Sequence, residues 1–112
     1  MRILLFVTFL LIFFYKLAFS DENSDEQQII AMGDIEYGQY LGAECASCHQ
    51  QTGANEGIPA INGMDAEIFV ALMLAYRSKE MENPVMQMIA GRLDDEQIGS
   101  LAIYFSQLEP PK

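Results

Sequence analysis

Both cysteines and the only histidine of this 112-residue chain lie within five consecutive residues, Cys45-Ala46-Ser47-Cys48-His49. This C-x-x-C-H spacing is the attachment pattern of a c-type haem. Two thiols three positions apart on one helical turn can each bond a vinyl group on the same edge of a haem, and the adjacent imidazole can reach the iron from one side. The motif therefore predicts a small domain organised around one covalently attached haem.

Three other uses of these residues fit the sequence less well. A thioredoxin-like dithiol needs a βαβ setting, and no segment alternates regularly enough to predict a strand. A zinc site would crowd two Cys and one His into five residues with no second ligand pair. A disulfide across two intervening residues would close a very small loop and would stabilise the fold little.

The first twenty residues have the plan of a secretory signal peptide. Arg2 gives a basic start, residues 3–15 form an apolar run, and Ala18-Phe19-Ser20 offers small residues where a signal peptidase reads them. We expect cleavage after Ser20 and a periplasmic protein, which fits the attachment of c-type haem outside the cytoplasm. The alternative is an uncleaved membrane anchor. The run is shorter than the ~20 residues that cross a bilayer. A segment counted through Phe19 comes closer to that length.

The part of the chain after Ser20 is small, acidic and poor in large apolar side chains. It holds two of the seven Phe, and the chain has no Trp. A domain of this size usually compensates for a thin core with disulfides, a metal or a bound cofactor. All 16 acidic residues lie in this part, and four basic residues oppose them: Arg77, Lys79, Arg92 and Lys112. Such a surface excludes nucleic acid and anionic membranes as partners, and a charged partner should present a basic docking face.

The pattern of helix starts and apolar spacings predicts an all-α fold with about four short helices around the haem. Asp34, Asp65 and Asp94 are expected N-caps, and Gln97 completes a capping box with Asp94. A further short helix is expected over 85–93, and residues 50–63 form a glycine-bearing loop. The expected buried residues are Ile35, Tyr37, Tyr40 and Leu41 in the first helix; Ile68 or Phe69, Leu72, Met73 and Tyr76 in the second; Met86, Ile89, Ala90 and Leu93 in the third; and Ile98, Leu101, Ala102, Phe105 and Leu108 in the last.

A second axial ligand for the iron must be a methionine, a lysine or nothing, because His49 is the only histidine. Methionine suits electron transfer because it raises the reduction potential of the haem. Met86 is favoured, since it stands two residues after Pro84, where the chain is stiff and a helix begins. Met88 and Met81 remain alternatives. The other methionines after the leader are less suited, because Met73 fits the apolar face of its helix, Met64 follows the glycine loop closely and Met32 precedes the domain.

With these residues in place, the chain resembles the class I cytochromes c over about residues 33–108. The resemblance rests on the helix before the haem motif, Gly57-Ile58-Pro59, Asn83-Pro84-Val85-Met86, and the stretch from Leu93 to Phe105. Within the class it is most similar to single-haem periplasmic cytochromes and to the cytochrome subunits of flavocytochrome c sulfide dehydrogenases. We therefore place a cytochrome c domain at 33–109, after the leader (1–20) and an acidic lead-in (21–32) that we expect to be disordered.

The resemblance implies a role for each residue of the site. Cys45 and Cys48 would form the thioethers, and His49 and Met86 would be the axial ligands. The Pro59 carbonyl would accept a hydrogen bond from the ring N–H of His49 and so fix the imidazole.

Two further features follow from the resemblance. The first and last helices of the domain would cross, with Tyr37 or Leu41 meeting Tyr104 or Phe105. Relatives often carry a Gly and an Arg before the Asn-Pro pair, where this chain has Lys79 and Met81. Arg77 is then the expected substitute for the residue that would hold a haem propionate.

The expected function is one-electron transfer by a carrier that is not itself an enzyme. Six-coordinate iron leaves no open position for a substrate, and an acidic surface should make association with a basic redox partner fast and sensitive to salt. One alternative is the haem subunit of a flavin-containing dehydrogenase that oxidises sulfide or another reduced sulfur compound. Another is a sensor or ligand-binding haem protein, which would need one axial site to open.

Overall fold

The computed structural model describes residues 23–51 and 57–112, and this part of the chain is all-helical. Its helices are α2 (Asn23–Ala31), α3 (Ile35–Cys48), α4 (Ala66–Arg77), α5 (Pro84–Gly91) and α6 (Asp95–Ser106). The predicted all-α class is confirmed for these residues. No helix within these two stretches is long and apolar enough to cross a membrane. The predicted leader, its cleavage site and residues 52–56 of the glycine-bearing loop lie outside the described residues.

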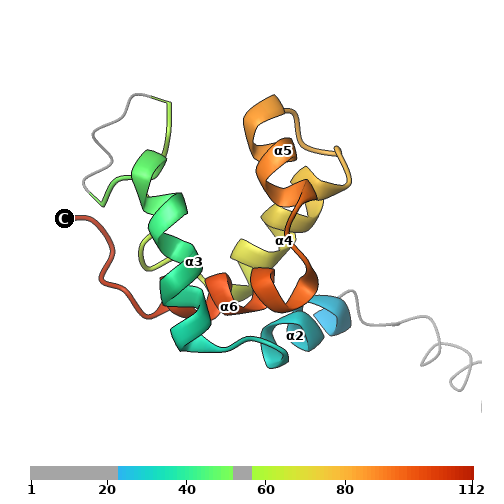
Figure 1. The fold of residues 1–112 in the computed structure, drawn as a ribbon, viewed down its shortest axis with the longest axis horizontal. Coiled ribbons are helices and arrows are strands. Elements are labelled where there is room, and N and C mark those ends of the chain that lie inside the picture. The colour runs from blue at the N-terminus through green and yellow to red at the C-terminus, as the bar shows by residue number, and fades with distance from the viewer. Residues whose placement is uncertain (1–22, 52–56) are drawn as a thin grey trace, which may run out of the picture.

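Helix α6 is the centre of the fold (Figure 1), with α2, α3 and α4 packed on it, while α5 packs on α4. The rings of Phe69 in α4 and Phe105 in α6 stack with their centroids 5.8 Å apart, and Tyr104 meets Phe105 edge-on at 5.1 Å. The stack of Phe69 on Phe105 joins α4 and α6 within a small core. The buried apolar residues are Ile29, Ile61, Phe69, Val70, Met73, Ala90, Ile98, Leu101, Ala102 and Phe105.

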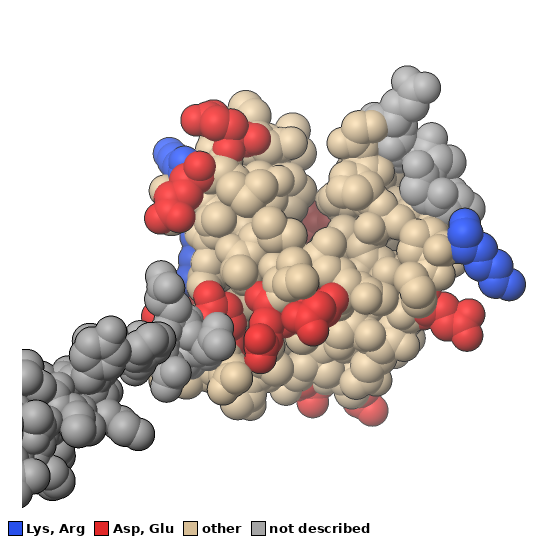
Figure 2. Space-filling model, turned by 180° about the vertical axis from the view of Figure 1, so that it is seen from behind, with Lys and Arg blue, Asp and Glu red and all other residues tan. Residues whose placement is uncertain are grey.

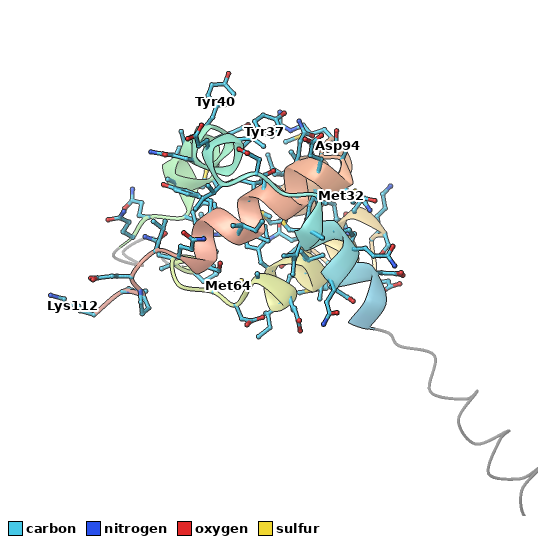
Figure 3. The ribbon with its side chains drawn as sticks, turned by 90° about the horizontal axis from the view of Figure 1, so that it is seen from below. Met32, Tyr37, Tyr40, Met64, Asp94 and Lys112 are labelled. Carbon is cyan, nitrogen blue, oxygen red and sulfur yellow. The ribbon has the colours of Figure 1, made fainter. Side chains whose placement is uncertain are left out.

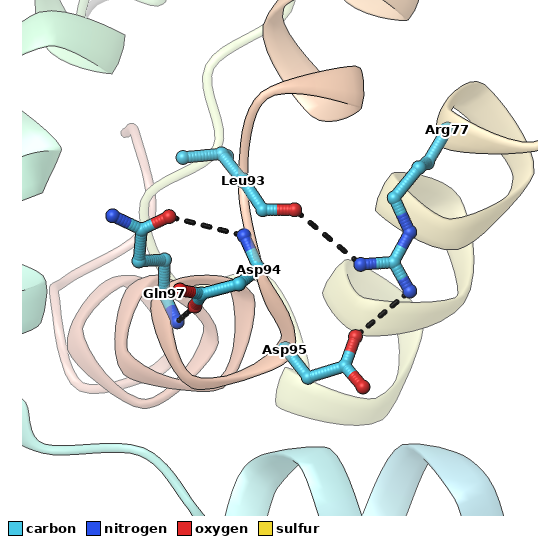
Figure 4. A network of polar contacts seen from close by, with 5 residues as sticks. All are labelled: Arg77, Leu93, Asp94, Asp95 and Gln97. Atoms are coloured by element: carbon cyan, nitrogen blue, oxygen red, sulfur yellow. Dashed lines mark hydrogen bonds and ion pairs between the residues drawn. The ribbon is translucent and has the colours of Figure 1, made fainter.

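The predicted N-caps are confirmed. Asp34 Oδ1 accepts the backbone N–H of Tyr37 at 2.8 Å, and Asp65 Oδ1 accepts two N–H groups of the first turn of α4. Asp94 and Gln97 form the reciprocal capping box, visible in Figure 4, with distances of 2.8 and 3.0 Å. These caps satisfy N–H groups that have no partner within the helix, which fixes where each helix begins.

Helix α3 crosses α6 at two glycines. A Cβ atom on Gly38 would lie 2.0 Å from the Ser100 carbonyl oxygen, and one on Gly42 would lie 2.8 Å from the Tyr104 ring. Glycine therefore lets the two backbones approach more closely than any larger residue would allow. The expected crossing of these helices is present, but its centre is Gly38 and Gly42, and the Tyr37 hydroxyl instead accepts a hydrogen bond from Gln97 at 3.0 Å.

Helix α3 differs from its prediction in length and in its buried face. It continues to Cys48, whereas the apolar pattern predicted buried residues only as far as Leu41. Tyr40 is 78% exposed and points away from the body of the molecule (Figure 3), and Ile35 is also exposed. The prediction that these two are buried is wrong, because the face that meets α6 is formed by the glycines and their neighbours.

The prediction of a disordered lead-in is wrong for Asn23–Ala31, which form α2. Ile29 is buried in the core, and α2 packs on both α6 and α4. The close approach is possible because Gly99 of α6 has no side chain: a Cβ there would lie 2.0 Å from the Ile29 carbonyl oxygen. The acidic composition of this segment did not indicate a helix, because the helix is stabilised by tertiary contacts rather than by its own sequence.

Replacing Gly38 with alanine is expected to destabilise the protein by about 3 kcal/mol, because the added methyl group would overlap the backbone of α6. Gly91→Ala is the matched control. A Cβ on Gly91 meets no atom within 4 Å, so this change should be neutral or stabilise by about 0.5–1 kcal/mol through helix propensity. Guanidinium unfolding of both variants tests the crossing; equal stabilities would contradict it.

Lys79 has a φ of +65°, in the left-handed region that favours glycine. It follows Ser78, the C-cap of α4, at the position where helices often end in glycine. Lys79→Gly is therefore expected to raise the free energy of unfolding by about 0.5–1 kcal/mol. Lys79→Ala, which keeps the strained backbone, should give no such gain. A gain from alanine as large as that from glycine would show that the charge, not the backbone, matters.

Candidate haem-attachment site

The C-x-x-C-H motif lies at the C-terminal end of α3. Cys45 and Cys48 occupy its last turn, and His49 is the C-cap, with its backbone N–H donating to the Cys45 carbonyl at 2.8 Å. Both cysteines carry thiols. The helix thus presents two thiols on one turn with an imidazole directly after them, which is the arrangement that the sequence analysis expected of a thioether-linked haem.

The His49 ring is oriented by a backbone carbonyl of the glycine-bearing loop. Its Nδ1 lies 2.7 Å from the Pro59 carbonyl oxygen, ten residues along the chain. A carbonyl oxygen can only accept, so Nδ1 carries the proton and donates it. Nε2 is then unprotonated in the neutral ring and keeps its lone pair for a metal. The contact implied by the resemblance is present in the structure and leaves Nε2 as the candidate ligand atom.

The two thiols differ in their surroundings. Cys45 is partly buried and packs against the core, whereas Cys48 is exposed and accepts a weak hydrogen bond from the Ser47 hydroxyl at 3.9 Å. Burial raises the pKa of the Cys45 thiol above its ordinary value, and the neighbouring Glu44 carboxylate raises it further. Cys45 is therefore protonated at neutral pH, as an unpaired thiol in an apolar setting should be.

Helices α4 and α5 form the other side of the candidate site, opposite the C-terminal end of α3. Helix α3 approaches α6 closely but makes no close backbone contact with α4 or α5. Figure 2 shows the surface hollowed between the two parts of the domain, and in Figure 1 α3 and α5 stand apart. Apolar side chains that are only partly buried, among them Leu41, Met64 and Met86, pack against the core. The donor set, two thiols on one helical turn and an oriented imidazole, could hold a haem.

The described methionines separate clearly by exposure. Met88 is 63% exposed and Met73 is 5% exposed within the core, so the structure confirms the core assignment of Met73. Met86 is partly buried against the core, and its backbone N–H donates to the Asn83 side chain at 3.0 Å, which fixes it in the first turn of α5. The favoured Met86 and the alternative Met81 are partly buried, whereas the alternative Met88 faces solvent.

Arg77, considered as a propionate partner, is engaged elsewhere. Its guanidinium forms an ion pair with Asp95 at 2.8 Å and donates to the Leu93 carbonyl at 3.4 Å (Figure 4). These contacts tie the end of α4 to the start of α6. The ion pair between Arg92 and Glu44 lies nearer the motif, because Glu44 directly precedes Cys45. Sequence reasoning missed this pair, since the two residues are 48 positions apart and neither stands in a recognisable motif.

Comparison with known proteins gives one informative similarity. No family model matches the chain. It is 29% identical over 98 residues to a protein of Stutzerimonas stutzeri (strain A1501) named thiosulfate dehydrogenase electron acceptor. The match covers 85% of this chain and 44% of that protein, so the chain spans less than half the length of this relative. By its name, the relative is an electron-transfer protein.

Proposed function

We propose that the chain is a periplasmic one-electron carrier that holds one haem c and receives electrons from an enzyme that oxidises thiosulfate. The observation that carries the proposal is the end of α3, where two thiols share a turn and the His49 ring is held by Pro59 with Nε2 left for iron. A haem c bound there would supply one-electron chemistry by changing between its ferric and ferrous states.

The residues of the chain have distinct parts in this proposal. Cys45 and Cys48 hold the cofactor covalently, which suits a domain too small to enclose it by packing alone. His49 supplies the ligand at the end of α3, and its hydrogen bond to Pro59 orients the ring. Met86 supplies the ligand from α5, where the Asn83 cap fixes the turn that carries it. A haem held by ligands from both helices would leave no position at its iron for a substrate, which would suit electron transfer.

The surface favours a basic redox partner. Two of the four basic residues after the leader, Arg77 and Arg92, are already in ion pairs with acidic residues. Figure 2 shows acidic side chains in several groups over one face, with few basic ones among them. Electrostatic attraction would then speed association with a partner of opposite charge, and added salt would slow it. The name of the Stutzerimonas relative suggests a thiosulfate dehydrogenase as the electron donor.

Sizing chromatography of the native periplasmic extract tests the proposal, with haem and flavin absorbance recorded together. We expect haem to elute at the size of the chain after Ser20, without flavin. Its haem should be reduced when thiosulfate and a purified thiosulfate dehydrogenase are added together, and more slowly at high salt. Haem and flavin in one larger peak would instead identify the chain as the cytochrome subunit of a flavoenzyme. A haem that thiosulfate and the dehydrogenase leave oxidised would contradict the proposed donor.

A further inference from the structure

The two proposed ligands stand on helices that are anchored to different neighbours. Helix α3, whose C-cap is His49, packs on α6, whereas the eight-residue α5, which carries Met86, packs on α4. The two helices make no close backbone contact with each other. Only Ala90 of α5 is fully buried. Packing therefore does little to fix the distance between α3 and α5 at the end of the domain where His49 and Met86 lie.

One ion pair spans this separation. Arg92, the C-cap of α5, contacts the carboxylate of Glu44 on α3 through its guanidinium. Arg92 lies six residues after Met86, at the other end of α5. Glu44 lies on α3, five residues before His49. Because a helix transmits position rigidly over so short a length, fixing these two residues fixes the approach of the helices that bear the ligands.

We propose that the Glu44–Arg92 ion pair is a clamp that bridges α3 and α5, limits their separation and so keeps Met86 in place as a ligand of the iron. The inference rests on the proposed function, since it concerns ligation of the haem iron. Glu44 and Arg92 are positioning residues, because they act on the ligand through their helices and do not touch the iron. Their side chains are 67% and 52% exposed, so the clamp is weak and is screened by salt.

A neutral competing ligand measures the clamp directly. Imidazole binds ferric haem only when the methionine has left, so its apparent affinity rises with the fraction of open protein. At a pH where imidazole is uncharged, Arg92→Gln and Glu44→Gln holoproteins should each bind it about twofold to fivefold more tightly than wild type at low salt. The difference should shrink at high salt. The double exchange Glu44→Arg with Arg92→Glu should restore an affinity close to that of wild type.

Arg77→Gln is the matched control. It breaks a less exposed ion pair, with Asp95, that joins α4 to α6 rather than α5 to α3. It should lower stability at least as much as Arg92→Gln, because Arg77 also donates to the Leu93 carbonyl, and leave imidazole affinity unchanged. Equal imidazole affinity in wild type and Arg92→Gln, or an equal rise in Arg77→Gln, would overturn the clamp alone. A wild-type protein whose ferric spectrum lacks the charge-transfer band of methionine ligation would overturn the proposed ligation, and the clamp with it.

Discussion

Exported His49→Ala protein is expected to accumulate no stable holoprotein. His49 is the only histidine in the chain, and its ring is the one held by Pro59 with Nε2 available. Without it the α3 side of the haem has no nitrogen ligand, so low-spin six-coordinate iron cannot form there. Haem staining of the periplasmic fraction, at the mass of the chain, measures the loss.

Gln50→Ala is the control for the preceding variant, because Gln50 is the exposed neighbour of His49. It should accumulate as holoprotein at the wild-type level. A His49→Ala protein that is normally folded and carries low-spin haem would show that the assignment of His49 is wrong.

Met86→Ala should leave the haem attached but lower its reduction potential by roughly 0.1–0.3 V, part of the range of about 0.8 V over which axial ligands set haem potentials. The attachment should survive because Cys45, Cys48 and the capping His49 stand at the end of α3, whereas Met86 belongs to α5. The ferrous variant should also bind carbon monoxide, which the wild type should exclude. Redox titration and carbon monoxide difference spectra give the two readouts.

Met88→Ala is the matched control for Met86, two residues along the same helix and 63% exposed. Its potential and its resistance to carbon monoxide should equal those of the wild type. If Met86→Ala keeps the wild-type potential, the ligand is another methionine, and Met81 is the next to test. Binding of carbon monoxide by the wild-type ferrous protein would instead favour the sensor hypothesis.

Local features of the fold could be predicted from the sequence because their causes are local. The caps at Asp34, Asp65 and Asp94 depend on a side chain and the backbone three residues ahead. The buried face of α6 follows from the spacing of its apolar residues. Helix α2 could not be predicted in this way, because its stability depends on the meeting of Ile29 with Gly99, 70 residues later.

The candidate site likewise combines features with local causes and features that depend on contacts between distant parts of the chain. The C-x-x-C-H motif is contiguous, so its position on one helical turn followed from spacing alone, and the resemblance supplied the contact between His49 and Pro59. The exposure of Met88 depends on how α5 lies on α4, which the local sequence cannot show. The Glu44–Arg92 pair required the whole fold, since it links two surfaces that only the packing around α6 brings together.

The mass of the purified exported protein, before and after proteolysis, tests the central claim most directly. The expected mass is that of residues 21–112 plus one haem. Proteolysis should give a single haem-bearing peptide that contains both Cys45 and Cys48, and acidified organic solvent should not extract the haem from it. A peptide with two unmodified thiols, or with a disulfide between them and no haem, would contradict it.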